Sequence, residues 1–112
     1  MFRDRHQLGR CCRVLLSLAG LQRLWTTRGG PTREALGLLE HGGGARLENH
    51  GERALLLAAW AFWTNDPRLI DELLPSLDRP RADAIRSLAI ACRGGAEAID
   101  AWLTTYEPPT VR

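Results

Sequence analysis

The chain has 112 residues, which corresponds to a single domain of ordinary size, and we treat residues 1–112 as one unit. Hydrophobic residues make up 45% and charged residues 25%, so a core can form without metals or disulfides, and no long segment is polar enough to be disordered. All 15 basic residues are arginines, and they are unevenly placed: residues 1–33 hold seven of them against one acid, whereas the remainder is acidic overall.

The first predicted element is a basic helix over about residues 4–27. Its apolar residues recur with the helical period, and its arginines spread over the other side. We expect Gly29 and Gly30 to end it, because glycine commonly follows a helix. From about residue 31 to residue 107, the chain is expected to be helical and to lean acidic. Thr32 is a candidate N-cap for the next helix.

Residues 54–63 are the most informative stretch, because ten consecutive residues carry no polar group except the tryptophan indole N–H. A helix that is apolar all round has no side to give to water, so it should be buried on all sides. It is too short to cross a bilayer, which takes about 20 apolar residues. We therefore predict a central helix at about 51–64, and no membrane association.

Helical signals continue to the end of the chain. Asp66 precedes Pro67, and Asp78 precedes another apolar-periodic segment, so both are candidate N-caps. Gly94 and Gly95 separate that segment from a final helix. No segment alternates like a strand, and leucine and alanine dominate over valine and isoleucine. We predict an all-α fold, a compact bundle of five to six short helices around the central one.

The sequence contains no recognisable pattern for catalysis, a metal or a cofactor. Its three cysteines and three histidines lack metal-ligand spacing, and the odd cysteine count argues against a secreted disulfide framework. We therefore expect a cytoplasmic protein that is not an enzyme and binds neither metal nor cofactor. A DNA-reading helix over residues 96–107 is disfavoured, because Glu97, Asp100 and Glu107 would meet a polyanion.

The functional expectation rests on the charge of the first helix. We predict a small adaptor or accessory subunit that binds another macromolecule, with a protein partner or self-association favoured. The residues expected to make the contact are Arg3, Arg10, Arg13, Arg23 and Arg28. One alternative is a subunit of a nucleoprotein complex that contacts backbone phosphates without reading sequence. Another is a small-ligand-binding or enzymatic domain with a groove lined by Trp25, Trp60, Trp63 and Trp102.

Overall fold

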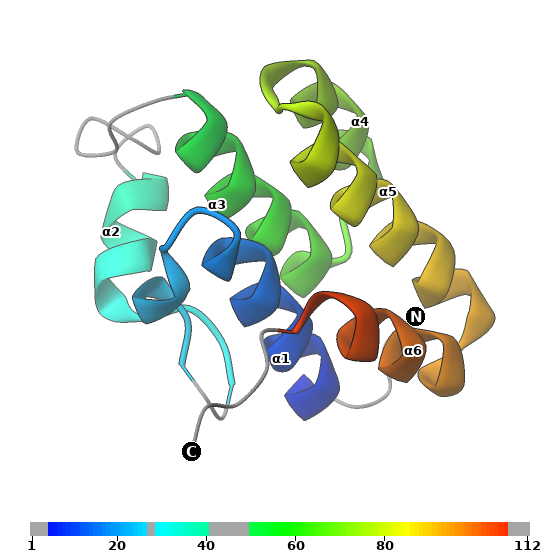
Figure 1. Cartoon of the computed structure of the whole chain (residues 1–112). Helices are drawn as coiled ribbons and strands as arrows, with labels where there is room; N and C mark the ends of the chain where they lie inside the picture. The colour runs from blue at the N-terminus through cyan, green and yellow to red at the C-terminus, as the bar shows by residue number, and fades with distance from the viewer. Residues whose placement is uncertain (1–4, 27–28, 41–49, 108–112) are drawn as a thin grey trace.

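The computed structural model describes residues 5–26, 29–40 and 50–107. In this part of the chain there are six α-helices, two short 3₁₀ turns and no strand, which confirms the predicted all-α fold (Figure 1). The elements are α1 (Arg5–Ser17), η1 (Gln22–Leu24), α2 (Arg33–Glu40), α3 (His50–Thr64), α4 (Pro67–Leu73), η2 (Leu74–Ser76), α5 (Arg79–Gly94) and α6 (Ala96–Tyr106). None of the described helices is long and apolar enough to span a membrane.

Helix α3 is the predicted central helix, and its bounds match the sequence-based estimate. It packs against α1 on one side and α4 on another, and most of its apolar residues are fully buried. The expectation of burial on all sides fails along one line of the helix. Leu57 and Trp60 are only half-buried there, and Arg53 and Thr64 are exposed at its two ends.

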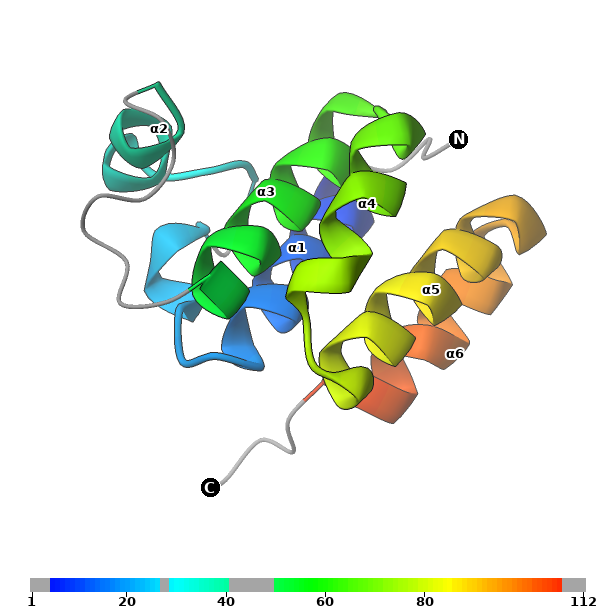
Figure 2. The same cartoon turned by 90° about the horizontal axis from the view of Figure 1, so that it is seen from above.

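Helix α1 is a second centre of the fold, which the sequence did not indicate. It packs against α3, α5 and α6, so its side chains are covered from several directions. Figure 2 shows α1 beneath α3, with α2 at one edge of the molecule and the α5–α6 hairpin at the other. The fully buried side chains that α1 contributes are Leu8, Cys11, Cys12, Leu15 and Leu16.

Helix α1 is shorter than the predicted segment 4–27, because its α-helical part ends at Ser17. Gly20 has a φ of 72°, and the amide of the buried Leu21 donates to the Leu16 carbonyl at 2.9 Å. The Gly20 amide donates to Ser17 at 3.1 Å, which completes a Schellman ending. Glycine is favoured at this left-handed position, so Gly20, and not Gly29 and Gly30, ends the helix.

The predicted N-caps differ in outcome. The Ala35 amide donates to Thr32 Oγ1 at 3.2 Å, and the Arg81 amide donates to Asp78 Oδ1 at 3.3 Å, so both of these caps are confirmed. Asp66 precedes α4, but its side chain makes no capping hydrogen bond. The α5–α6 turn uses Gly95 at a φ of 91°, and the two helices then pack side by side.

Candidate interaction surface

Arg10 and Arg13, two of the arginines predicted to contact a partner, are used within the molecule. Arg10 Nη2 lies 2.7 Å from Glu107 Oε1, which joins α1 to the residue after α6. The hydrogen bond to Glu107 raises the pKa of Arg10 above its ordinary value. Arg13 Nη1 donates to the carbonyls of Gln22 at 2.9 Å and Trp25 at 2.7 Å, and so ties η1 back to α1.

The remaining predicted arginines are less constrained or lie elsewhere. Arg23 Nη2 is 3.8 Å from Glu34 Oε1, and both side chains are well exposed. Arg3 and Arg28 fall outside the described residues. The set predicted as one contact face therefore includes two arginines held by internal contacts and one that faces solvent. Partner binding by these residues stays a prediction.

Arg5 belongs to a junction that was not predicted. Its guanidinium carbon lies 3.7 Å from the centroid of the Trp63 ring, and its Nη1 donates to the Trp63 carbonyl at 3.1 Å. Trp63 in turn meets Trp25 edge to face, with ring centroids 5.8 Å apart and the planes at 80°. Gly30 packs against the same indole, since a Cβ there would lie 2.7 Å from a Trp63 ring carbon.

The four tryptophans predicted as a groove are divided between contacts. Trp25 and Trp63 belong to the junction with Arg5. Trp102 is buried against α5, where its indole N–H lies 3.0 Å from the Ala84 carbonyl. It also packs on Tyr106, at 5.0 Å between ring centroids. Trp60 is half-buried on α3, and a ligand groove built from all four remains a prediction.

The outer side of α5 carries a line of five exposed residues that we call the α5 stripe. Its members are Arg79, Asp83, Arg86, Ile90 and Arg93. They are spaced alternately by four and three residues, which places them along one side of a helix. Ile90 is 70% exposed, and the only other exposed large hydrophobic side chain in the described ranges is Leu36, at 37%.

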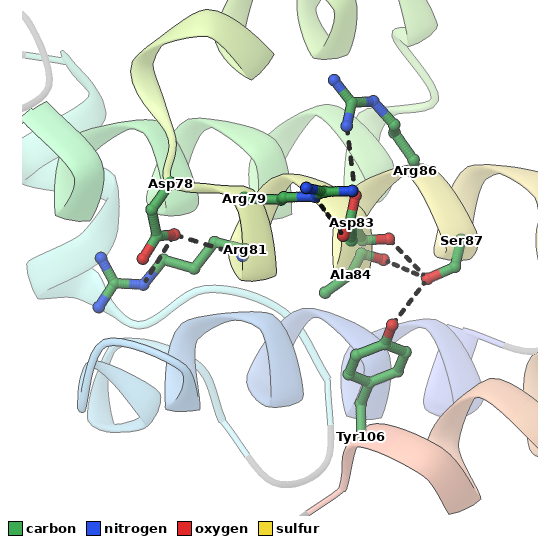
Figure 3. Close-up of polar contacts among 8 residues, drawn as sticks. All are labelled: Asp78, Arg79, Arg81, Asp83, Ala84, Arg86, Ser87 and Tyr106. Carbon is green, nitrogen blue, oxygen red and sulfur yellow. Dashed lines mark hydrogen bonds and ion pairs between the residues drawn. The ribbon is translucent and has the colours of Figure 1, made fainter.

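The ion pairs of the stripe are formed among three of its own charged members and not with the core. Asp83 Oδ1 lies 3.3 Å from Arg86 Nη1, and Asp83 Oδ2 lies 4.0 Å from Arg79 Nε. All three residues belong to α5. Figure 3 shows Arg86 pointing away from the side of α5 that Tyr106 contacts. Arg93 has no ion-pair or hydrogen-bond partner among the residues that the structure describes. These side chains remain accessible without breaking any contact between helices.

Ile90 is the member of this surface that sequence reasoning missed. The sequence places a helix between Asp78 and Gly94, but its capping and glycine signals do not draw attention to Ile90. Successive residues of an α-helix are about 100° apart, so Ile90 falls about 140° from the buried Ile85 and only about 40° from the exposed Arg86. A helical wheel of residues 79–94 is therefore the signal that could have found it.

The nucleophilic side chains show no activated geometry. Cys11 is buried, and desolvation raises the pKa of its thiol to about 12; the half-buried Cys92 has a pKa raised to about 11 by the same effect. Burial also raises the pKa of Cys12, whose Sγ donates to the Ala59 carbonyl at 3.3 Å. Within the described ranges, no cluster of three or more histidine, cysteine or acidic side chains could hold a metal.

Comparison of the chain with protein-family models, curated proteins and solved structures finds no match. The α5 stripe is therefore the feature from which a function can be inferred.

Proposed function

We propose that the protein is a non-catalytic helical adaptor that binds another macromolecule, and that the α5 stripe is its principal contact surface. The observation that carries the proposal is the 70% exposure of Ile90 between Arg86 and Arg93. Arginine is enriched at binding hot spots, where its charge is combined with a long apolar stem. An exposed apolar side chain at the centre of such a group can be desolvated on binding.

The internal contacts support α5 over α1 as the binding surface. A partner that recruits Arg10 must compete with Glu107 at 2.7 Å, and one that recruits Arg13 must release two backbone carbonyls. The Gln22 contact is exposed, but the Trp25 contact is partly buried, and a buried carbonyl left without a donor costs about 1–3 kcal/mol. Arg86 and Arg93 need no such release. Charge reversal at Arg13 would also disturb the fold, so it is a poor test of binding.

The non-catalytic part of the proposal is supported by the state of the nucleophiles. A thiol with a pKa near 12 or 11, as at Cys11 and Cys92, is protonated at neutral pH and is a weak nucleophile. The Ser87 hydroxyl lies within hydrogen-bond distance of the carbonyls of Asp83 and Ala84, at 2.8 and 3.0 Å (Figure 3), so its proton is directed to its own helix and not to a base.

A photo-crosslinking experiment in the cells that produce the protein tests this proposal. A benzophenone amino acid replaces Ile90 in one variant, and Thr105 on the exposed side of α6 in the control. Additional variants carry it at Leu36, Trp60 and Arg10, so that each candidate face is sampled. We expect one dominant crosslinked species from position 90, absent from position 105, and lost when Arg86 and Arg93 are changed to glutamine.

The outcomes separate the function from its location. Specific crosslinks at another position but none at position 90 would support the adaptor function and would assign its contact surface to that other position. No specific crosslink from any position would overturn the adaptor function itself. Crosslinking to nucleic acid in place of protein would favour the phosphate-binding alternative.

A further inference from the structure

We propose that the α5 stripe binds an acidic amphipathic helix of a partner protein, with an apolar side chain against Ile90 and carboxylates opposite Arg86 and Arg93. This inference rests on the adaptor function proposed above and names the chemistry of the partner. Three features of the stripe lead to it: its straight course along one helix, its charge, and its inability to pair with itself.

The shape of the stripe favours a helix as the occupant. At 1.5 Å per residue, the line from Arg79 to Arg93 extends for about 21 Å along the α5 axis. The alternating spacing of four and three residues is also the spacing along which two helices pack at a small crossing angle. A second helix can therefore follow the whole line, whereas a single compact ligand would meet only one or two of these side chains.

The charge of the stripe favours an acidic occupant. Three arginines against Asp83 leave a net charge of +2 on the line. The Arg79 and Arg86 side chains are 92% and 56% exposed, and Arg93 is unpaired in the described structure. Guanidinium groups bind carboxylates in a fork geometry, so glutamate or aspartate spaced at one helical face supplies matching acceptors.

A second copy of α5 is a poor occupant, because both orientations bring like charges together. In an antiparallel pair centred on Ile90, Arg86 of one copy lies beside Arg93 of the other. In a parallel pair in register, each arginine faces its own counterpart. Like charges directly opposite each other destabilise such a pair. The stripe is thus complementary to a different sequence and not to itself.

Nucleic acid and membrane surfaces fit the stripe less well. Ile90 gains nothing from a phosphate backbone, because a charged backbone offers no apolar contact to its side chain. An interfacial membrane helix presents a broad apolar face, whereas this line contains one apolar side chain. A partner with both an apolar centre and flanking carboxylates uses Ile90 and the arginines of the stripe together.

The test is a titration of the full chain with a synthetic helical peptide, followed by amide chemical shifts in NMR. The probe is an alanine-rich peptide of about 21 residues with a central leucine and glutamates three and four residues to either side. The matched control peptide has glutamine at every glutamate position. We expect shift changes confined to residues 79–93, with binding that weakens as salt is added.

Variants sharpen the expected result. The Arg86→Gln/Arg93→Gln double variant should weaken binding about tenfold, and Ile90→Ala about fivefold, which are moderate effects for charged and apolar contacts. Arg68→Gln, an exposed arginine on α4, is the matched control and should leave binding unchanged. Each variant should retain the helical circular dichroism spectrum, because none of these side chains joins two helices.

Several outcomes would overturn the inference. The glutamine peptide binding as well as the glutamate peptide would remove the role of charge. A concentration-dependent dimer without peptide, lost in the double variant, would replace the partner helix by a second copy. No shift at about 1 mM peptide would exclude this partner chemistry. Specific crosslinks from position 90 would still support the adaptor function in that case, so the two failures are distinguishable.

Discussion

The arginines of α1 and those of the α5 stripe have the same chemistry and different contacts. In α1, Arg5, Arg10 and Arg13 contact α3, the residue after α6 and the η1 region. In the α5 stripe, the ion pairs of Arg79 and Arg86 stay within one helix. A count of arginines along the sequence therefore locates positive charge but does not tell which charges remain available to a partner.

The side of the helix on which an arginine lies decides whether it contacts another element or stays available to a partner. Arg81 belongs to α5, yet it lies on the inward side and donates to the Leu18 carbonyl at 3.2 Å, just beyond α1. Arg5 similarly donates to the Trp63 carbonyl in the last turn of α3. Carbonyls at the C-terminal end of a helix lack helical donors and carry partial negative charge. A guanidinium supplies both a hydrogen-bond donor and a positive charge. Arg81 and Arg5 therefore act as C-terminal caps supplied by a distant element.

The largest effect is expected at Gly9, where α1 meets the Gly29 backbone. A Cβ at residue 9 would lie 2.5 Å from the Gly29 carbonyl oxygen, so one of the two backbones must shift. We expect Gly9→Ala to lower the free energy of unfolding by about 2 kcal/mol, in the range of other overpacked sites. Urea unfolding followed by circular dichroism measures it.

Gly37→Ala is the matched control, because it is also a helical glycine but a Cβ there meets nothing within 4 Å. This variant should raise the free energy of unfolding by about 0.5–1 kcal/mol through helix propensity. Equal stability of the two alanine variants would contradict the close approach of residues 9 and 29.

A smaller effect on stability is expected when an arginine of α1 is compared with an arginine of the α5 stripe. Arg13→Met keeps an apolar stem but leaves the Gln22 and Trp25 carbonyls without this donor, so we expect a loss of about 1–2 kcal/mol. Arg86→Met removes only an exposed ion pair within α5, and the loss should stay below about 0.5 kcal/mol. Urea midpoints of the two variants test the difference. Similar losses would mean that the α5 stripe also serves the fold.

Much of the fold could be predicted from the sequence, because strong local signals agreed with it. The apolar run at residues 54–63 marked α3, and Asp78 marked the start of α5 through its capping oxygen. The end of α1 was missed because apolar residues continue past Gly20 in helical spacing. There a left-handed glycine, and not the periodicity, decides where the chain turns.

The candidate surface was less predictable, because it depends on contacts between distant residues. No local signal near Arg10 predicts its ion pair with Glu107, which is 97 positions away in the sequence. The sequence therefore could not show that this arginine is engaged. Ile90, in contrast, was within reach of a helical wheel, since its exposure follows from its own helix and the position of Ile85.

The last comparison concerns the thiols of the two helices and is expected to have the smallest effect. Cys11 of α1 is fully buried, and its pKa of about 12 lies above the ordinary thiol value of 9.0. The folded state therefore keeps its proton at pH values where the unfolded chain loses it. Stability from this group is complete below pH 9.0 and declines as the pH rises toward about 12.

Raising the pH from about 7.5 to about 9.5 should thus cost roughly 1 kcal/mol through the Cys11 thiol alone. Urea unfolding at both pH values measures the decline, and Cys11→Ala should reduce it even though the variant starts from a lower stability. Cys12→Ala should act in the same direction, because burial raises that pKa as well. Cys92→Ala should reduce the decline by a similar amount over this range, because its folded-state pKa of about 11 also lies well above pH 9.5. An unchanged decline in both α1 variants would place the alkaline sensitivity in groups other than the buried thiols of this helix.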